Sequence, residues 1–259
     1  MPHAMKVDLN CDLGESFGRY QLGFDERVMD VVTSANIACG FHAGDPATMR
    51  RTAELARRKK VAVGAHPGFP DLPGFGRRNM DVSPEEAYDL VLYQIGALDA
   101  FARREGLKLQ HIKPHGALYN MAVGSAPLAG ALVRATRDYD QGLIFVGLPL
   151  SEMENAAHRL RVRFAAEVFA DRTYQPDGSL TSRREANAFV EDPAEAAARV
   201  VTMVREKRVQ AVTGQWISIR ADTICLHGDN PKAVSFIERI HKALKDSGLE
   251  LAPLAHWLA

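Results

Sequence analysis

The chain has 259 residues, of which 46% are hydrophobic and 25% are charged, which is ordinary for a globular protein and suits a single large domain. Lysine plus arginine number 32, as do aspartate plus glutamate, so the balanced charge argues against broad binding to nucleic acid or to an anionic membrane surface. The apolar runs are far shorter than the ~20 residues of a membrane span, and the N-terminus lacks an apolar signal-peptide core, so we expect a cytoplasmic protein.

Strand-like and helix-like patterns alternate along the chain with no low-complexity linker between them. Strands are expected at residues 6–10, 35–38, 61–65, 109–113, 143–148, 162–168 and 223–226, with a last short strand near 250–254. Helices are expected between the strands, and the predicted N-terminal signals are Asp25, Asp45-Pro46, Ser83-Pro84, Asp192-Pro193 and Asn230-Pro231. This alternation predicts parallel strands with right-handed helical crossovers. Seven or eight such units favour a TIM-like (β/α) barrel formed by residues 1–259 as a single domain.

Four apolar runs each end at a histidine beside a glycine, and an acidic version of the same pattern ends the first strand. In an α/β barrel, ligands bind at the carboxyl ends of the strands, so these side chains are expected to surround one polar pocket. The polar and ionisable side chains expected at this face are Asp8, Asn10, Asp12, Glu15, His42, Asp45, His66, Lys113, His115, Glu167, Asp171, Arg172, His227 and Asp229. Crowded carboxylates and imidazoles shift one another's pKa values, which supplies general acids and bases near neutral pH.

Some of these residues also have a purely structural interpretation. Asp45 precedes a proline at a helix start, so an N-cap role competes with a functional one. His111 is expected to pack between its strand and a helix. Lys113 is flanked by Ile112 and Pro114, which favours a desolvated ammonium facing a ligand.

The glycine-rich loop at residues 68–78 is long enough to be a lid or a binding loop, and its paired arginines, Arg77 and Arg78, suit a carboxylate or a phosphate. The sequence contains no G-x-x-x-x-G-K-[ST] pattern and no G-x-G-x-x-G pattern after a strand. We therefore expect no nucleotide site in this chain itself.

With these motifs in view, the chain resembles the LamB/YcsF family, whose members are A subunits of the prokaryotic 5-oxoprolinase. The matching stretches are residues 7–16 (VDLNCDLGES), 34–45 (SANIACGFHAGD), 64–71 (GAHPGFPD), 74–78 (GFGRR), 94–98 (QIGAL), 113–119 (KPHGALY), 167–174 (EVFADRTY) and 220–229 (RADTICLHGD). Arg183 is similar to an arginine in a loop of the family. The resemblance implies a barrel of the glycoside hydrolase/deacetylase type.

The resemblance also implies ATP-dependent opening of 5-oxoproline (pyroglutamate) to L-glutamate, together with partner subunits B and C. Because the chain lacks a nucleotide motif, we expect the partners to use ATP to phosphorylate the lactam and this chain to add water. Candidate catalytic residues are Asp8, Asp12, Glu15, His42, His66 and His115. Candidate substrate-binding residues are Asn10, Asp45, Arg77, Arg78, Lys113, Glu167, Asp171, Arg172, His227 and Asp229.

Among these, Asp12, Glu15 or His66 is the expected general base toward water, and His42 or His115 the expected acid for the leaving group. Lys113 and Arg77 or Arg78 are expected to hold the anionic groups.

Two other functions remain open at the level of the sequence. Asp12, His42 and His66 could form a divalent-metal site with an open water position, as in a metal-dependent deacetylase, so whether a metal binds is unknown. The chain could also be a non-catalytic barrel that regulates or supports its partner subunits.

Overall fold

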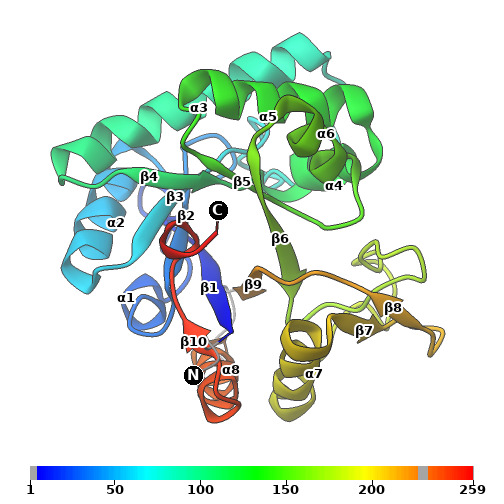
Figure 1. Cartoon of the computed structure of the whole chain (residues 1–259). Helices are drawn as coiled ribbons and strands as arrows, with labels where there is room; N and C mark the ends of the chain where they lie inside the picture. The colour runs from blue at the N-terminus through cyan, green and yellow to red at the C-terminus, as the bar shows by residue number, and fades with distance from the viewer. Residues whose placement is uncertain (1–4, 227–232, 259) are drawn as a thin grey trace.

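Parallel strands form a closed barrel with helices around the outside (Figure 1). The computed structural model describes residues 5–226 and 233–258. In this part of the chain the barrel has seven strands: β1 (Lys6–Leu13), β2 (Ser34–Ala38), β3 (Ala62–His66), β4 (Leu109–Ile112), β5 (Ile144–Gly147), β6 (Arg163–Phe169) and β9 (Thr223–Leu226). They pair in this order, and β9 pairs with β1 to close the ring. The TIM-like barrel predicted from the sequence is confirmed.

The helices that connect the strands cover the outer face of the barrel. They are α1 (Asp25–Val28), α2 (Pro46–Lys59), α3 (Pro84–Arg104), α4 (Gly116–Gly124), α5 (Ala126–Tyr139), α6 (Glu152–Leu160), α7 (Pro193–Glu206) and α8 (Ala233–Asp246). Three predicted caps are confirmed, because Asp45, Ser83 and Asp192 each accept a backbone N–H of the helix that follows.

Several elements differ from the sequence-based expectation. Asp25 is not an N-cap; it lies in the first turn of α1, where its carboxylate accepts the backbone N–H of Gly14. The short helix α4 and the antiparallel pair β7 (Arg208–Gln210) and β8 (Trp216–Ser218) were not predicted, because each is too short to show a clear hydrophobic period. The predicted helix start at Asn230-Pro231 lies outside the described residues.

The C-terminal segment packs against the amino-terminal ends of the barrel strands. After β10 (Glu250–Leu251) pairs with the start of β1, a 3₁₀ turn (Leu254–His256) brings Leu254 against Ile144, Val146 and Ala165. The backbone N–H of Ala255 donates to the side chain of Gln110 on β4. This packing covers the amino-terminal end of the barrel, and leaves the carboxyl ends of the strands to form a site.

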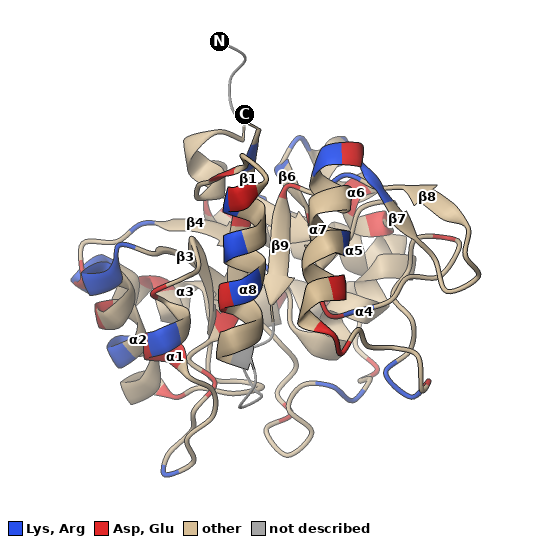
Figure 2. Cartoon of the chain, turned by 90° about the horizontal axis from the view of Figure 1, so that it is seen from below, with Lys and Arg blue, Asp and Glu red and all other residues tan. Residues whose placement is uncertain are grey.

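Positively and negatively charged residues are interspersed along the helices and loops in Figure 2, in keeping with the balanced composition. Within the described residues, no helix combines the length and the apolar character that a membrane-spanning segment requires.

Candidate functional site

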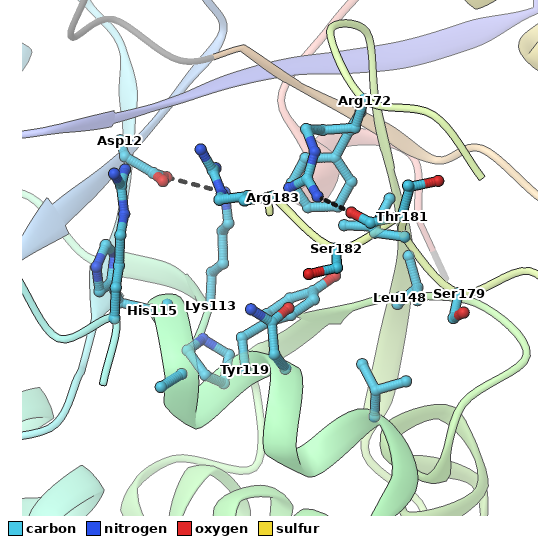
Figure 3. Close-up of a pocket in the computed structure, with 18 of the residues that line it drawn as sticks. Asp12, Lys113, His115, Tyr119, Leu148, Arg172, Ser179, Thr181, Ser182 and Arg183 are labelled. Atoms are coloured by element: carbon cyan, nitrogen blue, oxygen red, sulfur yellow. Dashed lines mark hydrogen bonds and ion pairs between the residues drawn. The ribbon is translucent and has the colours of Figure 1, made fainter. Parts of the chain in front are cut away.

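A cavity of about 390 Å³ lies at the carboxyl ends of the barrel strands (Figure 3). One wall carries Asp12, Glu15, His66, Lys113 and His115, which follow or end β1, β3 and β4. The opposite wall comes from the segment after β6, with Arg172 and residues 179–184. Further lining residues are Arg77, Pro114, Gly116, Ala117, Tyr119, Asn120, Val123, Leu148 and Phe169. The cavity therefore joins an acidic and histidine-rich wall to an arginine-rich one.

Lys113 is a buried ammonium at the base of the first wall. Its Nζ lies 2.8 Å from Asp12 Oδ1, 2.8 Å from Glu167 Oε1 and 3.0 Å from Cys225 Sγ. Burial on its own lowers the pKa of an ammonium, but Asp12, Cys225 and Glu167 outweigh this effect and hold the pKa of Lys113 well above its ordinary value. Lys113 therefore stays positively charged at neutral pH.

Asp12 is fixed by donors from neighbouring strands. Its Oδ1 accepts from Lys113 and, at 2.8 Å, from Nδ2 of Asn36 on β2. Asn36 Nδ2 also donates to Asn10 at 2.7 Å, and Asn36 Oδ1 lies 2.7 Å from His111 Nε2. His111 thus bonds across the interior of the barrel instead of packing between strand and helix, as the sequence had suggested. These bonds hold the Asp12 carboxylate at the cavity floor.

Three histidines form a compact cluster beside Asp12. His66 Nε2 lies 3.2 Å from Asp12 Oδ2 and 3.0 Å from His115 Nδ1. The rings of His42 and His115 stack with centroids 3.7 Å apart and an angle of 3° between their planes. His42 Nε2 also lies 3.4 Å from Glu15 Oε1. Together, Glu15, His42, His66 and His115 offer one ligand atom each, all within 4.8 Å of one another, so they are the candidate donors for a metal ion.

Burial controls the protonation of two of these rings. It lowers the pKa of His42 and of His115 well below the ordinary histidine value, and the neighbouring imidazoles lower both further. Both rings are therefore neutral at pH 7. A general-acid role for either residue, which the sequence had suggested, requires a protonated form that this environment disfavours.

The glycine-rich loop between β3 and α3 supports the histidine cluster from outside. A side chain at Gly76, whose φ is +61°, would place its Cβ 2.6 Å from the Cβ of His42. The loop is held at Gly68, where the backbone N–H donates to Gln94 and the carbonyl accepts from it, each at 2.9 Å. Farther along, the Arg78 guanidinium pairs with Asp71 within the loop. These bonds indicate a fixed support for the cavity.

The structure brings many of the predicted site residues together. Those that line the cavity are Asp12, Glu15, His66, Arg77, Lys113, His115 and Arg172. Asn10 and Glu167 lie directly behind Lys113, and His42 lies behind His115.

Besides Asn10, Glu167 and His42, which lie behind lining residues, four further predicted residues do not line the cavity. Asp8 is fully buried and accepts from the hydroxyls of Thr33, Ser34 and Thr223, so it is a residue of the barrel interior. Asp45 caps α2 and also accepts the backbone N–H of Gly18. Arg78 is held by Asp71, and Asp171 is not among the lining residues. His227 and Asp229 lie outside the described residues.

The sequence did not single out several residues that the cavity contains. Tyr119 and Asn120 come from α4, and Ser179, Thr181, Ser182 and Arg184 come from the loop after β6. The consecutive arginines Arg183 and Arg184 were the available signal for an anion-binding segment. The sequence of this long polar loop does not indicate whether the loop folds toward the barrel.

Comparison with known proteins adds independent information. The LamB/YcsF family matches residues 7–259 of the chain. The chain is 58% identical over 246 residues to the 5-oxoprolinase A subunit of Tolumonas auensis, and the match covers 95% of this chain and 98% of the relative. It is 54% identical over 250 residues to the protein of the same name from Bacillus subtilis, covering 96% of this chain and 97% of the relative.

Solved structures agree with the sequence relatives. The lactam utilization protein from Thermus thermophilus superposes with a TM-score of 0.92 at 46% identity, covering 96% of this chain and 99% of that one. The Bc1960 peptidoglycan N-acetylglucosamine deacetylase superposes with a TM-score of 0.51 at 13% identity, covering 98% and 88% of the two chains. At that identity the second likeness concerns the fold alone.

Proposed function

The chain belongs to the LamB/YcsF family, and we propose that it is the hydrolytic subunit of an ATP-dependent 5-oxoprolinase, which opens 5-oxoproline to L-glutamate. Relatives at 58% and 54% identity are named as the A subunit of 5-oxoprolinase, and a structural neighbour is called a lactam utilization protein. The observation that carries the proposal is the Asp12–Lys113 pair on the floor of the cavity, beside the histidine cluster. A cytoplasmic location remains a prediction.

The reaction needs activation, because the amide carbon of an unstrained lactam is a poor electrophile. Phosphorylation of the amide oxygen makes that carbon electrophilic and turns the oxygen into part of a leaving group. The sequence contains neither the G-x-x-x-x-G-K-[ST] pattern nor a G-x-G-x-x-G pattern after a strand, so we assign ATP binding and phosphoryl transfer to partner subunits B and C. This chain then receives the phosphorylated lactam. A small lactam fills only part of about 390 Å³, so the cavity also has room for the phosphoryl group.

The arginine-rich wall suits the two anionic groups of such an intermediate. Arg77, Arg172 and Arg183 all line the cavity. Burial lowers the pKa of Arg172 to about 10, and the positive charge of Arg183 is the second cause. The guanidinium groups of Arg172 and Arg183 are therefore close enough to repel each other. Hydrogen bonds to the carbonyls of Thr181 and Ala188 fix the Arg172 guanidinium. A carboxylate or phosphate bound here would relieve the repulsion and accept charge-assisted hydrogen bonds.

On the opposite wall, Asp12 is placed to move the protons. Its carboxylate takes a proton from water as the water oxygen bonds to the activated carbon, and returns that proton to the ring nitrogen as the carbon–nitrogen bond breaks. The remaining hydroxyl proton passes to solvent as the carbonyl of γ-glutamyl phosphate forms and the ring opens. A second water then attacks that carbonyl carbon, the bond between carbon and the phosphate oxygen breaks, and phosphate and L-glutamate are released. The Lys113 ammonium, 2.8 Å from Asp12, stabilises negative charge that develops on the oxygens.

Omission of this chain from the reconstituted system tests the proposal. ATP hydrolysis that depends on 5-oxoproline, and glutamate release, are measured with subunits B and C alone and after this chain is added. Glutamate release is expected only when all three are present. Equal glutamate release without this chain would contradict the assigned role.

A further inference from the structure

Two backbone carbonyls determine where the histidine cluster carries its protons. His66 Nδ1 lies 2.7 Å from the carbonyl oxygen of Lys113, and His115 Nε2 lies 2.8 Å from the carbonyl oxygen of Phe75. A carbonyl oxygen can only accept a hydrogen bond, so both of these nitrogens carry a hydrogen. In the neutral rings, the lone pairs are therefore on His66 Nε2 and His115 Nδ1.

Those two lone-pair nitrogens face each other at 3.0 Å. Neither can donate to the other in the neutral rings, and two nearby carboxylate oxygens are also acceptors. Asp12 Oδ2 lies 3.2 Å from His66 Nε2, and Glu15 Oε1 lies 3.9 Å from His115 Nδ1. Acceptors brought this close repel one another unless a cation lies among them. The geometry thus requires either a proton shared by the two rings or a metal ion.

The groups around these nitrogens carry an excess of negative charge. Asp12, Glu15 and Glu167 are three carboxylates, and the cationic groups near them among the described residues are Lys113 and Arg77, so with these groups ionised the net charge is −1. A cation among the acceptors therefore relieves their mutual repulsion.

We propose that His66 Nε2, His115 Nδ1 and the Glu15 carboxylate bind a divalent transition-metal ion, with an open coordination position toward the cavity. All three residues line the cavity. Two imidazoles and a carboxylate are the donor set of zinc and its first-row neighbours, and their outer ring nitrogens donate to backbone carbonyls, as metal-bound histidines do. Ligands bonded to one such ion at about 2.1 Å lie about 3–3.5 Å apart, which the 3.0 Å between the two nitrogens matches. Glu15 Oε1, at 3.9 Å from His115 Nδ1, would have to move closer to complete the set.

His42 takes a different place in this arrangement. It does not line the cavity, its ring stacks behind His115, and its Nδ1 has no hydrogen-bond partner among the described residues. No carbonyl fixes a hydrogen on Nδ1, so Nε2 carries it and donates to Glu15 Oε1 at 3.4 Å. His42 is therefore a positioning residue that orients the Glu15 carboxylate.

Metal binding is tested directly on the full-length chain without a histidine tag. The protein is dialysed against a chelator and then titrated calorimetrically with Co²⁺, Zn²⁺ or Mn²⁺. The visible spectrum of the Co²⁺ form reports the residues bonded directly to the ion. About one ion per chain is expected for the wild type. Glu15→Gln and His66→Ala are expected to weaken binding at least 100-fold, and His42→Gln by roughly 10–100-fold, as for other outer partners of metal ligands.

His158→Ala provides the matched control, because His158 is exposed on α6. It is expected to bind like the wild type, and circular dichroism establishes that each variant is folded. Glu15→Gln keeps the size of the side chain, so it remains informative if His66→Ala does not fold. If the wild type binds none of the three ions stoichiometrically, or if Glu15→Gln binds as tightly as the wild type, the proposal is overturned. The titration uses no substrate, ATP or partner, so its outcome is independent of the proposed hydrolysis.

Discussion

Asp12 and Asp8 show what a single residue's position in a strand can and cannot reveal. Both side chains belong to β1, four residues apart, so strand periodicity places them on the same face. Asp12 reaches the cavity, whereas Asp8 is buried among three hydroxyls, and burial raises its pKa despite those hydrogen bonds. The sequence pattern predicts the face of a strand but not the depth along the barrel axis. His42 lies in the loop after β2, where no strand period predicts the direction of its side chain.

Asp12→Asn is expected to lower the rate of glutamate release by the assembled system about 10²–10⁴-fold, because the amide cannot accept the proton from water. Steady-state kinetics with subunits B and C measures this loss. Asp89→Asn, at an exposed position on α3, is the control and should leave the rate unchanged. A folded Asp12→Asn variant with wild-type turnover would favour a non-catalytic role for the chain.

Arg77→Gln is expected to lower the rate of glutamate release by the assembled system roughly 10–100-fold when the phosphorylated lactam is not saturating, because a charged hydrogen bond to the anionic intermediate contributes about 1.5–3 kcal/mol. Arg77 lines the cavity, whereas Arg159 is exposed on α6, so Arg159→Gln is the matched control. An unchanged rate of glutamate release for Arg77→Gln would exclude Arg77 from binding of the intermediate.

The secondary-structure elements were predictable where they are long and carry end signals. The capping residues Asp45, Ser83 and Asp192 mark the starts of α2, α3 and α7, and the apolar runs mark the strands. The close fit between elements was not predictable. β3 contains Gly64 at a register shift, and a Cβ there would lie 2.2 Å from His111 Nε2. This strand needs glycine so that the imidazole of β4 can cross the barrel interior.

Gly64→Ala is therefore expected to lower the free energy of unfolding by roughly 1–3 kcal/mol, since one added methyl group overpacks the interior. Gly96→Ala is the contrasting variant. Gly96 lies inside α3, where an added Cβ would lie 3.9 Å from the ring of Tyr139, at ordinary contact distance, so alanine should stabilise the helix by about 0.5–1 kcal/mol. Urea unfolding of both variants measures the difference, and equal effects of the two substitutions would contradict this account of β3.

At the scale of the whole molecule, the barrel has a polar interior that composition does not reveal. Asn36 bonds to both Asn10 and His111 inside a ring of strands. Gln110 donates to Ser34 of β2 and accepts from Ala255 of the C-terminal segment. Alternation of strands and helices predicted the barrel, because that pattern has few compact solutions. It could not predict the internal bonds, which depend on the register between strands distant in sequence.

Acid should destabilise the barrel through His111. Burial lowers the pKa of this ring to about 3, with the charges of Lys113 and His66 adding to the effect. The folded-state pKa is below the unfolded value, so the contribution to stability is complete above pH 6.5 and is lost as the pH falls toward 3. The free energy of unfolding is expected to fall by about 1 kcal/mol per pH unit from this group.

Urea unfolding at pH 7, 6 and 5 measures that slope. His111→Gln should be less stable at pH 7 but show a smaller slope, while His158→Gln, at an exposed position, should retain the wild-type slope. Parallel slopes for the wild type and His111→Gln would exclude His111 as a source of acid sensitivity.

The central claim, that this chain adds water to a phosphorylated lactam, is tested most directly by following one oxygen atom. 5-Oxoproline labelled with ¹⁸O at the ring carbonyl is incubated with ATP, subunits B and C and this chain, and the products are analysed by mass spectrometry. The account predicts that the label leaves in inorganic phosphate and that substituting Asp12→Asn in this chain abolishes both labelled phosphate and glutamate. Unlabelled phosphate, with all of the label retained in glutamate, would contradict it.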